Sequence, residues 1–315
     1  MESPVELVTR MNQEIDRVVS PFVNQKPFAL LDFPDYPNVG DSAIWLGNIA
    51  FFSRKGLAPS CISRMTRIDS ERLKGQETIV LSGGGNFGDI WSEHWPNCQA
   101  FREAVMERFP GKKIVQLPQS IHFNSRRNVD SAARAIEALR DRKSLDFARK
   151  NFQCQVGLCP DMAYALGPLA RSYPPKKNVL FLLRTDIERA SNAADGMPKL
   201  PSNSDIADWL VEPFWIAGAA IMAAMATHGL SFALKRIPRE RLVRKYFDNK
   251  ARLRLARGLR LLSNYKTVVS DRLHVHILCC LLGIPHIMLD NSYGKIGGFM
   301  DAFSTKGQGS IAPTI

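Results

Sequence analysis

The 315-residue sequence has no run of apolar residues long enough to cross a membrane. Its longest strongly apolar stretch, residues 214–225, falls well short of the roughly 20 residues that a transmembrane helix needs. Residues 1–16 carry charges and lack the apolar centre of a secretory signal. We therefore expect a cytoplasmic protein with no transmembrane helix.

Cysteine is scarce and shows no pattern typical of a metal site. None of the six cysteines forms a CxxC pair or lies at zinc-finger spacing from a histidine. Cys279 and Cys280 lie in an apolar run, which favours buried thiols over ligands. We expect neither a metal nor a resident cofactor.

The common nucleotide-binding motifs are also missing. Gly83, Gly84 and Gly85 follow an apolar segment, but they match neither GxGxxG nor a Walker A loop, since no GK[ST] follows. Successive glycines let a backbone approach a ligand closely and let its N–H groups cradle an anion. We favour a substrate-binding loop over a purely structural turn here. Asp89 and the nearby Trp91 and Trp95 suit a sugar, although core packing explains the tryptophans nearly as well.

Positive charge is abundant and concentrated. The formal net charge is +12, and residues 235–260 hold eleven Lys or Arg against Glu240 and Asp248, a local net charge of +9. A solvated helical face, a dock on anionic lipid and a nucleic-acid patch are the three interpretations. No recognised nucleic-acid-binding module surrounds the segment, so we expect no nucleic-acid partner.

Short apolar segments alternate with helical stretches through the first half of the chain. This alternation predicts a parallel sheet with helices on both faces. The predicted strands are 29–31, 78–81, 113–117 and 156–158, and the predicted helices are 42–54, a segment before Pro110, and 132–141.

A Pro- and Lys-rich segment, residues 171–177, has the composition of a linker, and the alternation restarts after it. We predict an α/β fold of two Rossmann-like domains, residues 1–172 and 173–315, that face a central cleft. The second domain is predicted to contain strands 178–183, 230–234, 267–269 and 286–289, helices 214–228 and 276–282, the basic helix, and a mobile loop at 191–205.

The most informative segment follows the predicted strand at 267–269. Asp271, Arg272 and His274 come directly after it, and ligands of open α/β sheets bind outside the carboxyl ends of strands. Arginine offers a fixed fork of donors to a carboxylate or phosphate, and histidine exchanges protons near neutral pH. The alternative is a salt-bridged arginine and a packed histidine.

Similar polar residues follow other predicted strands. Arg184 ends the first strand of the second half, and with Arg272 it would suit a dianion or two anionic groups. Asn38, Gly40 and Asp41 precede a predicted helix, where Gly40 can take positive φ and free N–H groups favour an anion or a hydroxyl. An ordinary capped turn explains this motif as well.

Seven segments, in this order, resemble the polysaccharide pyruvyltransferase family. The likeness extends from about Asp32 to Lys295, and it looks closest to bacterial exopolysaccharide ketal-pyruvate transferases such as those acting on succinoglycan. The segments are Asn38-Val39-Gly40-Asp41, Ser82-Gly83-Gly84-Gly85, Pro118-Gln119-Ser120, Pro160-Asp161, Leu183-Arg184, Ser270-Asp271-Arg272-Leu273-His274 and Asp290-Asn291-Ser292-Tyr293-Gly294-Lys295.

This resemblance implies a GT-B-like fold that uses phosphoenolpyruvate as a co-substrate to place a pyruvate ketal on a sugar, without a metal. His274 would be the general acid, and Arg184, Arg272, Leu273 and Lys295 would hold the donor. The N-terminal half would bind the saccharide acceptor, and a lipid-linked oligosaccharide acceptor would give residues 235–260 a role at the inner membrane face. The acceptor side would include Asn38, Gly40, Asp41, Gly83, Gly84, Gly85, Asp89, Gln119 and Ser120.

Two other functions remain open. A nucleotide-sugar glycosyltransferase of polysaccharide biosynthesis is the first, because one fold hosts many donors. A non-catalytic scaffold that has kept the fold is the second.

Overall fold

The protein is described by a computed structural model. It covers residues 2–23, 27–66, 68–89, 98–123, 136–139, 141–152, 154–185, 201–213, 215–216, 219, 222, 239–290, 294–303 and 310–311. The predicted helix at 214–228 and loop at 191–205 lie mostly outside these ranges, and the strand at 230–234, Trp91 and Trp95 lie wholly outside them.

The first half of the chain forms a seven-stranded sheet in which every strand pair is parallel. The strand order is β2-β1-β3-β5-β6-β7, and β4 pairs with the second half of β5. The strands are β1 (Phe28–Leu31), β2 (Cys61–Ile62), β3 (Thr78–Leu81), β4 (Gly84–Gly88), β5 (Lys113–His122), β6 (Ile136–Leu139) and β7 (Val156–Leu158). The helices of this half are α1 (Pro4–Val19), η1 (Ser20–Phe22), α2 (Val39–Arg54), α3 (Ser70–Lys74), α4 (Cys98–Arg108), α6 (Arg142–Asn151) and η2 (Met162–Leu166).

The second half forms a five-stranded parallel sheet with the order β12-β11-β10-β8-β9. Its elements are β8 (Lys177–Leu182), β9 (Asp205–Ala207), α8 (Arg239–Ser263), β10 (Tyr265–Ser270), α9 (Leu273–Leu282), β11 (His286–Met288), α10 (Lys295–Ala302) and β12 (Ser310–Ile311). The predicted α/β class with parallel sheets is confirmed, and the connection between the two sheets runs from Leu158 to Lys177.

Most of the predicted strands form where short apolar runs can be buried on both sheet faces. Every residue of β1 and β3 is buried, as expected for central parallel strands. The helix predicted at 132–141 is wrong, because residues 136–139 form β6 between β5 and β7. Ladder pairing to two neighbouring strands outweighs the high helix propensity of its Ala, Glu and Leu residues.

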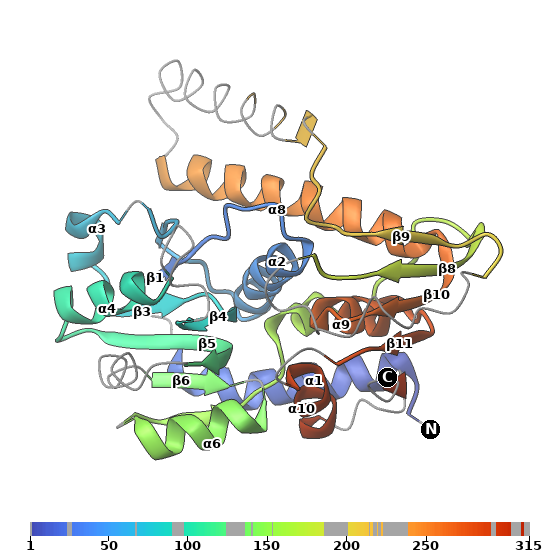
Figure 1. The fold of residues 1–315 in the computed structure, drawn as a ribbon. Coiled ribbons are helices and arrows are strands. Elements are labelled where there is room, and N and C mark those ends of the chain that lie inside the picture. The colour runs from blue at the N-terminus through green and yellow to red at the C-terminus, as the bar shows by residue number, and fades with distance from the viewer. Residues whose placement is uncertain are drawn as a thin grey trace.

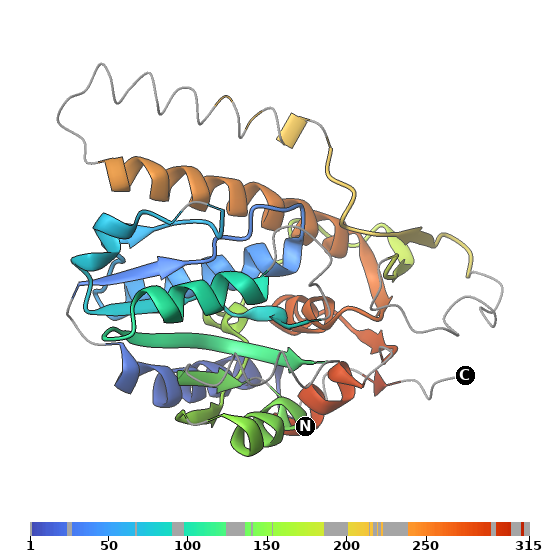
Figure 2. The ribbon, with the colours of Figure 1, turned by 60° about the vertical axis from the view of Figure 1, so that its left-hand side comes forward.

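Helices join the two sheets into one body. A single buried apolar cluster takes in residues of α1, α2 and η2 from the first half and of α9 and α10 from the second. The helix α8 extends over both sheets in two views of the molecule (Figures 1 and 2), and it packs against α2. The N-terminal helix α1, which sequence patterns did not predict, begins with a capping box between Ser3 and Glu6.

The basic helix α8 has an inner and an outer face. Lys250 bonds to Asp35, and Arg254, which is 3% exposed, pairs with Glu212 at 2.8 Å. Lys245, Arg252 and Arg260 are exposed. Part of the positive charge therefore holds the fold together. No helix of the described residues is long and apolar enough to span a membrane.

Candidate active site

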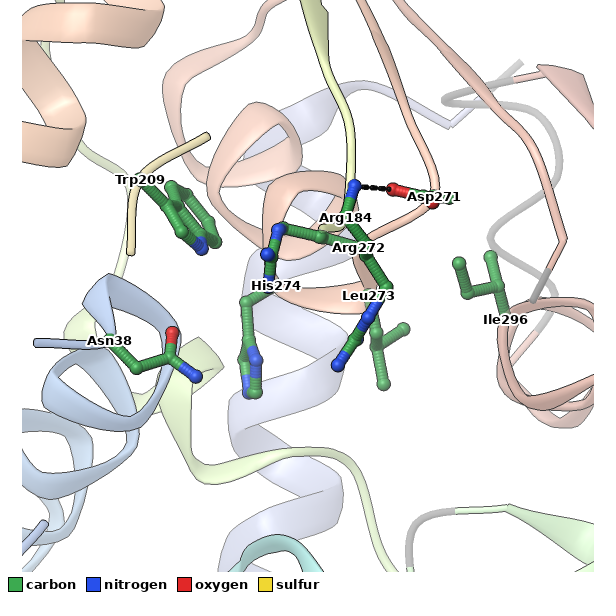
Figure 3. Close-up of a pocket in the computed structure, with 8 residues that line it drawn as sticks. All are labelled: Asn38, Arg184, Trp209, Asp271, Arg272, Leu273, His274 and Ile296. Carbon is green, nitrogen blue, oxygen red and sulfur yellow. Dashed lines mark hydrogen bonds between the residues drawn. The ribbon is translucent and has the colours of Figure 1, made fainter. Parts of the chain in front are cut away.

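A pocket lies where the carboxyl ends of β8, β9 and β10 meet the N-termini of two helices (Figure 3). Three of the sequence-predicted donor residues, the predicted general acid and Asn38 come together here. The residues that line it are Asn38, Arg184, Trp209, Asp271, Arg272, Leu273, His274 and Ile296.

Asp271 fixes the spacing of two neighbouring strand ends. Its Oδ1 accepts a 2.8 Å hydrogen bond from the backbone N–H of Arg184, which joins the end of β10 to the end of β8. Burial raises the pKa of the Asp271 carboxyl, and the charges of Arg184 and Arg272 partly oppose that rise. Arg184 itself is half-buried at the pocket wall.

Arg272 is tied to an acid that the sequence analysis did not identify. Its Nη2 donates to both carboxylate oxygens of Asp208 at 2.8 Å, and both side chains are more than nine-tenths buried. Asp208 also accepts from the Thr185 hydroxyl at 2.7 Å and from the N–H of Leu210 at 3.2 Å. The salt bridge considered as an alternative from sequence is therefore present, and it fixes the guanidinium of Arg272 at the pocket wall.

His274 is held between a buried acid and a glycine. Its Nε2 lies 3.4 Å from Oδ2 of Asp161, which is fully buried and whose Oδ1 accepts from the N–H of Ala163 at 2.9 Å. On its other side, a Cβ added to Gly40 would lie 2.3 Å from Nδ1 of His274. Gly40 is thus required for close approach to the imidazole. The positive φ expected for it is not observed, since it lies in the first turn of α2.

Two helices direct their N-terminal ends to this pocket. The helix α9 begins at Leu273 after the N-cap residue Arg272, which makes no side-chain cap, and α2 begins after Asn38, whose Oδ1 accepts from the N–H of Gly40 at 3.0 Å. Both ends carry the positive partial charge of the helix dipole. Together with two arginines, they favour an anionic ligand.

The carboxyl edge of the first sheet carries a different set of polar groups. Arg102 of α4 is 1% exposed and donates to Asp32 at 3.3 Å, to Gln116 at 2.9 Å and to Oδ1 of Asn86 at 2.8 Å. The amide of Gln119 donates to the same Asn86 oxygen at 2.8 Å. Asp32 has a φ of 70°, a strained conformation for a residue with a side chain. Burial raises the pKa of Asp32 to about 6, against the opposing charge of Arg102.

Three predicted acceptor-side residues meet at this edge. A Cβ added to Gly84 would lie 3.5 Å from Oδ1 of Asp41 and 3.7 Å from Oε1 of Gln119. The Gln119 oxygen is buried and makes no hydrogen bond with the described residues. Asp41, Gly84 and Gln119 therefore border one small region. These three residues, like Ser120 and Asp89, are not among those that line the pocket of His274.

The glycine run has a structural cause that the sequence analysis ranked second. Gly84 and Gly85 lie in the strand β4, so the predicted loop is wrong there. A Cβ added to Gly83 would lie 2.2 Å from the carbonyl oxygen of Pro118, and one added to Gly88 would lie 1.8 Å from that of His122. Close packing of backbone against β5 thus requires these two glycines.

Asp208, which holds Arg272, and the lining residue Trp209 were missed from sequence. They follow β9, whose three residues Asp-Ile-Ala are too few to show a strand pattern. The polar Asp208 directly after the apolar pair Ile206-Ala207 was the one signal in the sequence that could have indicated it. Lys295, predicted to help hold the donor, begins α10, but its side chain lies outside the described residues.

One buried cluster near the site combines residues that often bind metals. Atoms of His276, Cys280 and His286 lie within 4.8 Å of one another. His286 must donate through Nδ1 to the carbonyl oxygen of Ile284 at 2.8 Å, so its Nε2 accepts a hydrogen bond from Nδ1 of His276 at 2.7 Å. Burial lowers the pKa of both histidines, so both are neutral. In this neutral pair, the hydrogen bond between them occupies Nδ1 of His276 and Nε2 of His286.

Comparisons with known proteins agree with this arrangement of motifs. A model of the polysaccharide pyruvyl transferase family matches residues 38–293. Pyruvyl transferase 1 of Schizosaccharomyces pombe is 28% identical over 306 residues, which cover 88% of this chain and 70% of that protein. EpsO of Bacillus subtilis, named as a candidate pyruvyl transferase, is 28% identical over 317 residues, which cover 94% of this chain and 90% of EpsO.

The fold also occurs in a solved structure. The crystal structure of the functionally uncharacterised protein KP1_0663 from Klebsiella pneumoniae matches with a TM-score of 0.61 at 20% identity. The match covers 96% of this chain and 98% of that one, and it concerns the fold alone.

Proposed function

This chain belongs to the polysaccharide pyruvyl transferase family, and from that premise we propose that it moves pyruvate from phosphoenolpyruvate to two hydroxyls of one sugar. The product would be a cyclic ketal, and phosphate would be released. The observation that carries the proposal is the pocket in which Arg184, Arg272 and His274 meet at the N-terminus of α9.

The pocket suits a small donor with two anionic groups. Phosphoenolpyruvate carries a phosphate and a carboxylate, and guanidinium groups bind both by charge-assisted hydrogen bonds. Arg184 and Arg272 would hold these groups, with the backbone N–H groups at the start of α9 around Leu273. Lys295, at the start of α10 beside the pocket residue Ile296, would add a further cation.

His274 would carry the proton chemistry. His274 protonates C3 of the enol, which makes C2 electrophilic, and an acceptor hydroxyl then attacks C2 and returns its proton to His274. The C2–O bond to phosphate then breaks, a second hydroxyl attacks C2, and its proton leaves with phosphate. Each proton step needs a group that titrates near neutrality. Asp161, behind Nε2 of His274, would hold the imidazole in one orientation and stabilise its charged form.

The acceptor would approach from the first sheet. Asp41 and Gln119 place oxygen atoms near Gly84, and carboxylate and amide oxygens accept hydrogen bonds from sugar hydroxyls. Asn38 and Gly40 lie between this region and His274, at the start of α2. We propose that the sugar is bound across this boundary, with its reacting hydroxyls toward His274.

The reaction itself is the direct test. Purified protein would be incubated with phosphoenolpyruvate and a panel of saccharides, and phosphate release and the methyl signal of the ketal would be followed together. We expect both to require a saccharide with two neighbouring hydroxyls. Transfer from a nucleotide sugar without use of phosphoenolpyruvate would overturn the proposal.

A lipid-linked acceptor would bring the protein to an anionic membrane face. Lys245, Arg252 and Arg260 of α8 are exposed, and each basic residue near such a surface contributes about 1 kcal/mol. We propose that this outer face of α8 docks there. Replacing the three residues by Glu should abolish sedimentation with anionic vesicles, and neutral vesicles are the control. Unchanged sedimentation would refute the dock.

A further inference from the structure

The indole N–H of Trp209 is a buried donor that makes no hydrogen bond with the described residues. Trp209 is 2% exposed, and none of the described residues accepts a hydrogen bond from its Nε1. Most buried polar groups in proteins are hydrogen-bonded, and each exception needs an explanation. In Figure 3 the indole nitrogen points toward the middle of the residues that line the pocket. A bound ligand is therefore the natural partner for this donor.

The surroundings of Trp209 select the charge of that ligand. The pocket is also lined by Arg184, Arg272 and the first residues of α9. An indole nitrogen donates only, and it accepts nothing. A ligand oxygen that accepts from this N–H also lies beside two guanidinium groups and a helix N-terminus. This environment favours an oxygen that carries negative charge.

The position of Trp209 is fixed from both sides. The preceding residue, Asp208, holds Arg272 through both carboxylate oxygens. The carbonyl oxygen of Trp209 accepts from Arg257 of α8 at 2.6 Å, and the same side chain reaches the carbonyl oxygen of Pro37 at 3.4 Å, next to Asn38. The indole is thus anchored before a ligand arrives, which limits the conformational cost of binding.

We propose that Trp209 is a donor-binding residue whose Nε1–H bonds to an anionic oxygen, phosphate or carboxylate, of the pyruvyl donor. The inference rests on the proposed function, since it takes the anionic donor to be phosphoenolpyruvate. It adds a neutral, directional contact to the charged contacts of the arginines.

Nuclear magnetic resonance of the wild-type protein tests the contact without a substitution. The chain has five tryptophans, so ¹⁵N labelling gives at most five indole signals, which substitutions at the other four positions assign. We expect phosphoenolpyruvate to move the Trp209 signal downfield and to leave that of Trp45 in place. Inorganic phosphate and pyruvate, added separately, would show which anionic group makes the bond.

Binding measurements on Trp209→Phe provide the second test. Loss of a hydrogen bond to a charged group should weaken phosphoenolpyruvate binding by roughly ten- to hundred-fold in calorimetry. Trp45→Phe is the matched control, because Trp45 is also buried but its N–H already bonds to Asp248 at 3.0 Å. That variant should bind phosphoenolpyruvate as the wild type does.

The outcomes separate this inference from the proposed function. If the wild type binds phosphoenolpyruvate while the Trp209 signal stays in place and Trp209→Phe binds equally well, the indole contact is refuted and the function stands. If the wild type does not bind phosphoenolpyruvate, the proposed donor is wrong and the inference falls with it. Should Trp209→Phe fail to fold, the wild-type spectra alone decide.

Discussion

Both sheets place arginine at their carboxyl edges, but the two environments differ. Arg102 at the first sheet is 1% exposed, and its three nitrogens donate to Asp32, Gln116, Asn86 and the carbonyl oxygen of Cys98. Arg184 at the second sheet is half-buried and lines a pocket. An arginine at the carboxyl edge of a sheet is therefore not in itself a sign of function. What separates the two is that Arg184 lines a pocket, whereas protein acceptors enclose the guanidinium of Arg102.

The same contrast extends to the atoms that lack partners. Among the described residues at the second edge, the indole N–H of Trp209 is an unpaired donor that suits an anion, and Oδ2 of Asp271 is an unpaired acceptor. At the first edge the atom is Oε1 of Gln119, an acceptor that suits a hydroxyl. Under the proposed function, the second sheet would hold the anionic donor and the first sheet would hold the hydroxyl-bearing acceptor.

The largest effect is expected at His274. His274→Gln keeps a polar side chain but removes the proposed general acid, so phosphate release should fall by roughly 10²–10⁴-fold, with little change in melting temperature. Phosphate release under saturating substrates is the measurement. His122→Gln, at the end of β5, is the control and should stay active. Activity retained in His274→Gln would show that His274, at the edge of the second sheet, takes no part in the reaction.

Arg102→Met should damage stability instead of chemistry. The substitution removes the buried positive partner of the Asp32 carboxylate and the Arg102 donor to the Gln116 amide oxygen. Breaking such a buried ion pair costs about 3–5 kcal/mol in the free energy of unfolding. Urea denaturation measures this cost, and the exposed Arg260→Met is the control. The activity per folded molecule should remain close to that of the wild type. A stable but inactive Arg102→Met variant would show that Arg102 binds a ligand. It would contradict the distinction between a structural arginine at the first sheet and a ligand-binding arginine at the second.

Gly40→Ala tests where the two edges meet. The added Cβ would lie 2.3 Å from Nδ1 of His274, so the imidazole must move. A displacement near 1 Å at a catalytic group costs roughly 100-fold in rate, and we expect a drop of about that size in phosphate release. Gly298→Ala is the control, since nothing lies within 4 Å of an added Cβ there. Full activity in Gly40→Ala would show that His274 tolerates a shift.

Acid should act with opposite signs on the buried histidine pair of the second half and on Asp32 of the first sheet. Burial places the folded-state pKa of His276 and His286 below the ordinary value of 6.5, so the unfolded state binds protons more tightly and their contribution to stability is lost as pH falls below 6.5. Asp32 has a folded pKa of about 6, above its ordinary 3.8, so its protonation between pH 6 and 4 favours the folded state.

Denaturation across pH 4 to 8 separates these contributions, which are the smallest effects expected. Relative to the wild type, His286→Gln should lose less stability as pH falls below 6.5, whereas Asp32→Asn should lose more between pH 6 and 4. Identical pH profiles in the wild type and both variants would contradict the assignment.

The second edge was largely predictable because its motif is local. The buried Val268 and the half-buried Val269 lie near the end of β10, and Arg272 and His274 follow within five residues. Arg184 could be placed beside them because parallel strands end at the same edge. Asp208 and Trp209 were not found, since the three-residue strand before them has too little pattern to detect.

The first edge was less predictable because distant contacts decide it. Arg102 lies on a helix and reaches Asp32 across seventy positions of sequence. The glycines at 83 and 88 are required by the backbone of β5, which no local pattern reveals. Residues 136–139 form a strand only because β5 and β7 pair with them on either side.

Thermal stabilisation by ligands tests the central claim, an anionic donor at the second sheet, most directly. A ligand at 100 times its dissociation constant adds about 2.7 kcal/mol to the free energy of unfolding. We predict that phosphoenolpyruvate raises the melting temperature of the wild type, that Arg184→Ala abolishes this rise, and that nucleotide sugars have no effect. A rise with a nucleotide sugar, or a phosphoenolpyruvate effect that survives in Arg184→Ala, would contradict the claim.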